Sequence, residues 1–178
     1  MQGKSAFPET HRFALGSGGL ATTGPVNHFL NKADLIFGIG CSFSETNFGV
    51  KMPPGTTIIH ATLDPADVNK DVNCALAVLG DAKLVLSAII EELRRQGAKD
   101  PKDPHGVAAE IKEIHDTWLG KWLPKLTYNE APLSPYRVLW DLPHTVDVAN
   151  TIITHDAGSP RDQLSPFWRS ITPLSYIG

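Results

Sequence analysis

The sequence predicts an α/β fold, in which a partial parallel sheet is followed by the first helix and strand of a second α/β domain. Strand-length apolar runs alternate with helix-length amphipathic stretches, and this alternation is typical of parallel α/β layers. The first of these runs is continuously apolar, as expected where helices cover both faces of a sheet. Three strands are expected in the first half of the chain and one in the second, which is too uneven for a complete sheet.

The expected strands of the first half are short and end in turn residues. They lie at residues 34–40, 57–62 and 74–79. The first ends in Gly40, and the second leads into Asp64. A short helix is expected before them, from Pro25 to Lys32, because a proline at the first helical position gives up an N–H that is not needed there.

Amphipathic stretches and a fourth strand follow the sheet. The helices are expected at residues 82–96, 107–123 and 135–142, and the strand at residues 151–154. Asp81 is the expected N-cap of the first helix, since its carboxylate can accept the unpaired N–H groups of the first turn. Pro124 is expected to end the second helix. Ser134 and Pro135 have the residue types that open the third.

Composition and charge exclude several classes of protein. The chain has 178 residues, is 42% hydrophobic and carries a formal net charge of −3, so it has a globular composition without a basic surface for nucleic acid or membrane. Its apolar runs are far shorter than the roughly 20 residues of a membrane-spanning helix, and its first residues lack the apolar core of a signal peptide. We therefore expect a cytoplasmic protein, with its two cysteines reduced and mostly buried.

The ends of the expected strands form the candidate binding site. Ligands of open α/β sheets bind at the carboxyl ends of the strands, near a switch in strand order. Gly40 would let a phosphate or a ring approach the backbone there, and Asp64 could accept a hydrogen bond from a ribose hydroxyl. Ordinary loop chemistry is the alternative, which the residue spacing alone leaves open.

Three further polar segments carry weaker signals. The turn at residues 156–159 could direct backbone N–H groups toward an anion. His155 and Asp156 are adjacent, so they point to opposite faces of a strand and are poorly placed to act as an acid/base pair. The glycine-rich stretch at residues 16–19 is either a tight loop or a loop that contacts a ligand.

Four motifs, in order along the chain, resemble the thiamine-diphosphate-dependent enzymes of the acetolactate synthase and benzoylformate decarboxylase type. The first is a Gly-Lys-Ser-Ala-Phe-Pro-Glu-Thr-His segment at residues 3–11, with glycines following at residues 15–20. The others are the strand at residues 33–40, the strand end at residues 58–67 and the helix start at residues 79–83. Each motif alone is common, but four in sequence over about 80 residues are specific.

The resemblance implies a place within a larger subunit of three α/β domains. In this family the first domain carries a glutamate that activates the cofactor, the central domain has a Rossmann-like sheet, and the third binds diphosphate and Mg²⁺. Residues 1–96 would be the C-terminal part of the central domain, residues 97–133 a linker with one helix, and residues 134–178 the start of the thiamine-diphosphate-binding domain. Such a chain would lack the activating glutamate and the metal motif, so we expect a fragment that is not active alone.

The resemblance also implies cofactors and the residues that contact them. The full-length parent would use thiamine diphosphate and Mg²⁺ to decarboxylate or ligate 2-oxo-acid substrates, as a homodimer or homotetramer. Gly158 and Ser159 fall where the third domain contacts the diphosphate. The positions that match nucleotide contacts of FAD-binding members are Gly40, Ser42, Asp64 and Asp81. The arginine of that site is replaced within residues 42–46, which favours an empty cleft over bound FAD or ADP.

Two other functions are compatible with parts of the sequence. One is a non-catalytic nucleotide-binding or structural module derived from the same fold, which binding of FAD or ADP without Mg²⁺ would favour. The other is an NAD-dependent deacylase of similar fold, which would need four zinc-binding cysteines, whereas the chain has two. Under every interpretation, an incomplete sheet would leave apolar faces and strand edges uncovered, so we expect poor solubility.

Overall fold

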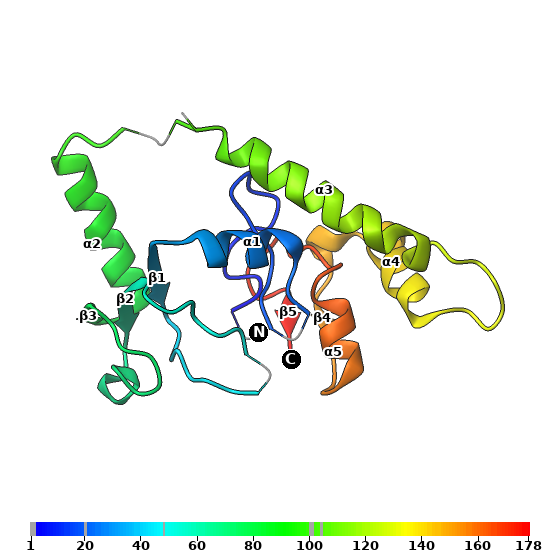
Figure 1. The fold of residues 1–178 in the computed structure, drawn as a ribbon, viewed down its shortest axis with the longest axis horizontal. Coiled ribbons are helices and arrows are strands. Elements are labelled where there is room, and N and C mark those ends of the chain that lie inside the picture. Colours follow the sequence, from blue (N-terminus) through cyan, green and yellow to red (C-terminus); the bar gives the residue numbers. More distant parts are fainter. Residues whose placement is uncertain (1–2, 20, 48, 100–101, 104) are drawn as a thin grey trace. The chain divides into compact units, whose positions relative to one another are not determined.

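The computed structural model describes residues 3–19, 21–47, 49–99, 102–103 and 105–178, and it confirms the α/β class. Helices and two parallel sheets succeed one another along the chain (Figure 1). The chain divides into two compact units, which we call the sheet unit (residues 30–103) and the helical unit (residues 1–29 and 104–178). The domain boundaries expected from the resemblance stay predictions, because they refer to the domains of the family's whole subunit.

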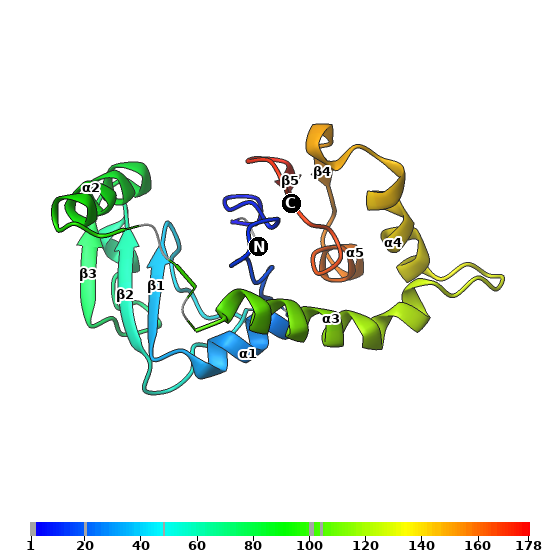
Figure 2. The ribbon, with the colours of Figure 1, turned by 90° about the horizontal axis from the view of Figure 1, so that it is seen from above.

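The sheet unit is built on three parallel strands. These are β1 (Leu35–Ile39), β2 (Thr57–Thr62) and β3 (Leu76–Leu79), in the order β1-β2-β3. A 3-10 turn, η1 (Pro65–Asp67), follows β2, and the helix α2 (Ala82–Arg95) follows β3. Figure 2 shows the three strands side by side in one layer. Each lies within the range expected from the sequence, because the β-branched runs and the turn residues at their ends are local signals.

The apolar sheet is less buried than the sequence predicts for a continuously apolar strand. Leu35 is 51% exposed, Phe37 41% and Leu76 54%. Phe37 pairs with Ile59, and Ile59 with Leu76, so these side chains share one face of the sheet. The helix α2 has no buried residue, and its Leu84 is 68% exposed. Apolar faces are therefore uncovered, as expected for a partial sheet, while the solubility itself stays a prediction.

The helical unit contains most of the helices and a short second sheet. The elements are α1 (Gly24–Lys32, which ends just beyond the unit), α3 (Val107–Leu126), α4 (Pro135–Thr145), η2 (Val148–Asn150), β4 (Ile153–Thr154), α5 (Ser159–Leu164) and β5 (Tyr176–Ile177). β4 and β5 pair in parallel over two residues each. An added Cβ on Gly24 would lie 2.6 Å from Cβ of Trp118, so glycine there allows α1 to pack closely against α3.

Two helices continue through a proline, and one of these prolines, Pro124, was expected to end its helix. α3 runs through Pro124 to Leu126, and α4 runs through Pro143 to Thr145. Pro124 lacks an N–H and cannot bond the carbonyl of the preceding turn, but Leu126 beyond it is fully buried. Burial of that leucine stabilises the last turn by roughly 1.5–3 kcal/mol, which offsets the lost hydrogen bond. The Thr127 hydroxyl also donates to the Leu123 carbonyl oxygen at 2.7 Å.

The core of the helical unit is aromatic. Leu164, Trp168 and Tyr176 form its buried cluster, with Trp168 only 1% exposed. Beside it, the rings of Trp118 and Phe167 stack with centroids 5.6 Å apart. Aromatic side chains bury large areas, so this cluster supplies much of the unit's hydrophobic stabilisation.

Two expectations from the sequence concern the burial of the cysteines and the absence of a membrane-spanning helix. Cys41 is exposed and Cys74 half-buried, both as free thiols, so the expectation of mostly buried cysteines is wrong. Cys41 lies in the turn after β1, where the chain leaves the sheet. Within the described residues, every helix is too short or too polar to span a bilayer.

Candidate functional site

Three of the predicted site residues meet at one edge of the three-stranded sheet. Gly40 follows β1, Asp64 follows β2 and Asp81 follows β3. The strands are parallel and adjacent, so their carboxyl ends lie at the same edge. The gathering expected from the sequence is therefore present, and we call it the carboxyl edge, defined by these three residues.

Gly40 brings the start of α2 close to the end of β1. Its φ of +62° lies in the left-handed region, which glycine adopts without steric cost. Its N–H donates to the Ala61 carbonyl oxygen at 2.9 Å, which extends the pairing of β1 with β2 by one residue. A Cβ on Gly40 would lie 3.8 Å from Cβ of Ala82, the first residue of α2. The three strand ends and the helix N-terminus thus form one compact edge.

Carboxylates already occupy the helix starts at the carboxyl edge. Oδ1 of Asp81 accepts from the N–H groups of Lys83 at 2.9 Å and Leu84 at 3.1 Å. Oδ1 of Asp64 accepts from the Ala66 N–H at 2.9 Å. A phosphate bound there would lose these donors and meet two negative charges. The edge is better suited to hydrogen-bond donors, such as the hydroxyls of a ribose, than to phosphate oxygens.

Ser42 lies in the loop after β1, beside the segment that follows η1. Its hydroxyl donates to Oγ of Ser44 at 3.0 Å, and Nζ of Lys70 donates to the same Ser44 oxygen at 3.3 Å. The Glu45 N–H donates to Oδ2 of Asp71 at 3.0 Å. These bonds connect the loop to residues 70–71 and place one cation, Lys70, next to the serine pair.

Gly158 and Ser159 open α5 in the helical unit. Gly158 has a φ of +87° and a ψ of −149°, a conformation that only glycine adopts readily, and no side chain caps the helix. An added Cβ on Gly158 would meet nothing within 4 Å, so the turn is open. The neighbouring Ala157 N–H already donates to Oδ1 of Asp156 at 2.6 Å, which removes one of the N–H groups that the sequence assigned to anion binding.

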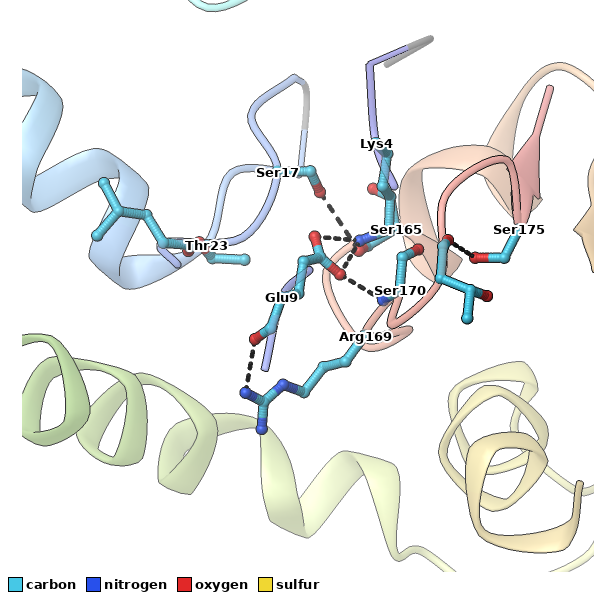
Figure 3. Close-up of polar contacts among 10 residues, drawn as sticks. Lys4, Glu9, Ser17, Thr23, Ser165, Arg169, Ser170 and Ser175 are labelled. Atoms are coloured by element: carbon cyan, nitrogen blue, oxygen red, sulfur yellow. Dashed lines mark hydrogen bonds and ion pairs between the residues drawn. The ribbon is translucent and has the colours of Figure 1, made fainter. Parts of the chain in front are cut away.

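A buried ion pair between Lys4 and Glu9 is the feature that the sequence did not identify as a site (Figure 3). Nζ of Lys4 lies 2.6 Å from Oε1 and 2.7 Å from Oε2 of Glu9, and the Lys4 side chain is only 1% exposed. Oε2 of Glu9 also accepts from the Ser170 N–H at 2.6 Å, and the Glu9 carbonyl oxygen accepts from Arg169 at 2.7 Å. No local sequence pattern predicts the burial of Lys4. The ion pair is completed by Ser170, which lies 161 residues from Glu9 in the sequence.

The ion pair lies beside a cavity of about 280 Å³, lined by residues 3–5, 7, 9 and 14–18. Gly16 has a φ of +95°, and a Cβ there would come within 3.1 Å of the Thr23 side chain. Oγ1 of Thr23 donates to the Leu15 carbonyl oxygen at 2.7 Å, and Oγ of Ser17 to the Ser165 carbonyl oxygen at 3.3 Å. These contacts account for Gly16 as part of a tight loop, which is one of the two interpretations that the sequence allowed.

Burial changes the acid–base properties of this cluster. It lowers the pKa of the Lys4 ammonium, although Glu9 beside it acts in the opposite direction. Burial, with smaller contributions from Glu9 and Asp162, raises the pKa of Tyr176 to about 12. Nζ of Lys4 lies 5.4 Å from the centroid of the Tyr176 ring, so both groups belong to one low-dielectric region.

Because of Tyr176, the stability of the helical unit is expected to fall as the pH rises from about 10 to about 12. Its folded pKa of about 12 lies above the usual value of 10.0, so its contribution is complete below pH 10 and lost by about pH 12. That pKa difference corresponds to about 3 kcal/mol. The lowered pKa of Lys4 has the opposite effect, because it makes the helical unit more stable as the pH rises toward 10.5, the usual value for lysine. Urea unfolding of the wild type and of Tyr176→Phe separates the two effects, and parallel pH curves for the two proteins would contradict the assignment.

His60 and His155 contact backbone carbonyl oxygens. His60 is fully buried, and its Nε2 lies 2.7 Å from the Cys41 carbonyl oxygen. Nδ1 of His155 lies 3.1 Å from the Asp156 carbonyl oxygen, not from its carboxylate. Among the described residues, no group of three or more His, Cys, Asp or Glu side chains could hold a metal ion.

The sheet unit has the architecture of parallel α/β proteins, in which the carboxyl edge of the sheet carries the binding site. Residues 1–89 match the family model of the central domain of thiamine pyrophosphate enzymes, so the chain belongs to that family. Thiamine pyrophosphate is thiamine diphosphate, the cofactor that gives this family its name.

Acetolactate synthase large subunits are similar to the chain over nearly all of its length. It is 30% identical, over 99% of its residues, to a probable acetolactate synthase large subunit of Methanococcus aeolicus, of which it covers 31%. The corresponding protein of Methanocaldococcus jannaschii is 30% identical over 99% of the chain, which covers 30% of it. The isozyme 3 large subunit of Escherichia coli K12 is 31% identical over 89% of the chain, which covers 27% of it. The chain thus spans about 30% of the length of these relatives.

Proposed function

We propose that this chain is part of a thiamine-diphosphate- and Mg²⁺-dependent enzyme of the acetolactate synthase type, which decarboxylates or ligates 2-oxo acids. One observation carries the proposal: the similarity to acetolactate synthase large subunits covers 99% of the chain and continues past the central-domain match at residues 1–89. Because the relatives are about three times as long, we propose that these residues do not catalyse the reaction alone. A homodimeric or homotetrameric parent and a cytoplasmic location are parts of the same proposal.

Gly158 and Ser159 are the residues that we propose for the diphosphate group. The open space around Gly158 and the uncapped start of α5 fit a close approach of phosphate oxygens to backbone N–H groups. The carboxylate of Asp156 is bound to its own turn, but its charge opposes an anion, so a divalent cation would be needed to balance it. When bound, the cofactor would supply the electron sink for the bond that breaks as a 2-oxo acid loses CO₂.

The carboxyl edge favours a second candidate function, a nucleotide-binding module without catalysis. Gly40, Asp64 and Asp81 lie together, and the two carboxylates can accept from ribose hydroxyls. In this arrangement FAD or ADP would place its ribose at the edge and its phosphates away from the capped start of α2.

Calorimetric titration of the full chain with thiamine diphosphate and Mg²⁺ distinguishes the two functions. We expect a dissociation constant of roughly 1 mM, since only part of the site is present. Gly158→Val should abolish this binding because valine cannot adopt the backbone conformation, whereas Gly97→Val, at another open glycine with φ of +76°, should not.

Three outcomes decide between the alternatives. Binding of FAD or ADP without Mg²⁺ that is lost in Gly40→Val would favour the nucleotide-binding module. Formation of acetolactate from pyruvate by the chain alone would refute its proposed inactivity. A folded chain that fails to bind thiamine diphosphate even at about 10 mM would contradict the diphosphate site.

A further inference from the structure

A second cavity of the helical unit lies between the N-terminal segment, the first turns of α3 and Arg169. Its volume is about 340 Å³, at the lower end of the range for small-ligand sites. It includes neither the carboxyl edge nor the turn at Gly158. The ionisable residues that line it are His11, Arg12, Lys112, His115, Asp116 and Arg169.

The cavity is positively charged, although the chain as a whole is acidic. Among the described lining residues, the cations are Arg12, Lys112 and Arg169, from three separate segments, and the one acid is Asp116. The formal charge of this lining is therefore +2 with the histidines counted as neutral. The whole chain has a net charge of −3. Gathering like charges costs free energy, which a bound anion of matching charge would offset.

Arg169 is held in place, and among the described residues its guanidinium makes one hydrogen bond, which leaves most of its donors for a ligand. Its Nη2 donates to the Glu9 carbonyl oxygen at 2.7 Å, which uses one of the five N–H groups of the guanidinium. Glu9 is itself fixed by the buried Lys4 ammonium at 2.6 Å. Figure 3 shows the Arg169 side chain extending from its loop toward the α3 helix, whose residues line the same cavity. Its orientation is therefore set before any ligand binds.

His11 adds a hydrogen-bond donor, and Asp116 opposes the cations. Nδ1 of His11 accepts from the Phe13 N–H at 3.2 Å, so in its neutral form the proton is on Nε2, which can donate to a ligand. Nζ of Lys112 lies 2.5 Å from Oδ2 of Asp116 and holds the pKa of this carboxyl below its usual value. Asp116 therefore stays charged and competes with an anion for Lys112.

We propose that this cavity binds a multivalent oxyanion of the phosphate class. A divalent anion matches the formal charge of +2 on the described lining residues. Guanidinium groups pair with two phosphate oxygens at once, and Arg12 and Arg169 supply such groups from two different segments. The anion would come either from free phosphate or diphosphate or from the phosphate group of a larger molecule. This inference does not depend on the proposed thiamine site.

Titration of the full chain with inorganic diphosphate, without divalent cations and at constant ionic strength, tests the proposal. We expect saturable binding in the range of about 0.1–1 mM. Arg12→Gln should weaken it about tenfold, and Asp116→Asn should tighten it about threefold, because one change removes a cation and the other a competing anion. Lys121→Gln removes a charge from the same helix but outside the cavity. It should change the affinity less than twofold, because salt screens the interaction between a distant charge and the anion.

Competing ligands identify the source of the anion. ADP that binds more tightly than diphosphate, and is equally sensitive to Arg12→Gln, indicates the phosphate of a nucleotide; equal or weaker binding of ADP indicates the free anion. Gly40→Val should leave both affinities unchanged, which separates this cavity from the carboxyl edge. Equal weakening by Arg12→Gln and Lys121→Gln, or no saturation up to about 10 mM diphosphate, would overturn the proposal.

Discussion

Truncation of Trp168 to alanine is expected to lower the free energy of unfolding of the helical unit by about 3–5 kcal/mol. The indole is only 1% exposed and forms the buried cluster of the unit with Leu164 and Tyr176. Its removal would open a cavity between α5 and the segment that leads to β5, in a unit that has few other fully buried large side chains among its described residues. Loss of contacts and the cavity left behind both add to the cost.

Urea unfolding followed by tryptophan fluorescence is the suitable measurement. All four tryptophans of the chain lie in the helical unit, so Trp118, Trp122 and Trp140 still report its unfolding in the variant. Leu174→Ala is the control, since that leucine is 80% exposed and its loss should cost less than about 0.5 kcal/mol. Trp168→Phe keeps an aromatic ring and should cost clearly less than alanine. A loss below about 1 kcal/mol in Trp168→Ala would show that the cluster is not the core.

Local signals in the sequence were sufficient to predict the strands of the sheet unit and the start of α2. The β-branched run at Thr57–Thr62 forms β2 at the expected residues, and Asp81 caps α2 through two backbone N–H groups. The gathering of Gly40, Asp64 and Asp81 also followed from the sequence, because the ends of adjacent parallel strands share an edge. Whether these residues bind a cofactor stays a prediction, since that depends on a ligand rather than on the fold.

The features that the sequence did not reveal depend on contacts between distant segments. β5 pairs with β4 over two residues, and α5 has six residues, so neither has a periodic pattern to detect. The last turn of α3 forms despite Pro124 because Leu126 is buried. The exposure of Phe37 depends on what covers the sheet, which an apolar run does not specify. The partner of Glu9 lies at the other end of the chain, at Ser170.

Removal of one partner of the Lys4–Glu9 pair is expected to destabilise the helical unit by about 3–5 kcal/mol. Lys4→Met leaves the Glu9 carboxylate, with a side chain only 11% exposed, without its cation and with the Ser170 N–H as its remaining donor among the described residues. Glu9→Gln leaves the Lys4 ammonium buried without a counter-charge. In both variants an uncompensated charge stays in a low-dielectric region, and this cost far exceeds the loss of a neutral hydrogen bond.

The double variant Lys4→Met/Glu9→Gln distinguishes an unpaired charge from a simple loss of contacts. Both charges are absent in it, so its stability should exceed the value that adding the two single effects predicts, by roughly 1–3 kcal/mol. Lys112→Met is the matched control, because it breaks a lysine–carboxylate pair of similar length whose side chains are 78% and 55% exposed. Solvent screens that pair, so the urea midpoint should not change. Additive single effects, or an equal response to Lys112→Met, would mean that burial of the Lys4–Glu9 pair does not determine its contribution to stability. The N-terminal segment would then be held to Ser170 by the backbone hydrogen bond from the Glu9 N–H to the Ser170 carbonyl oxygen.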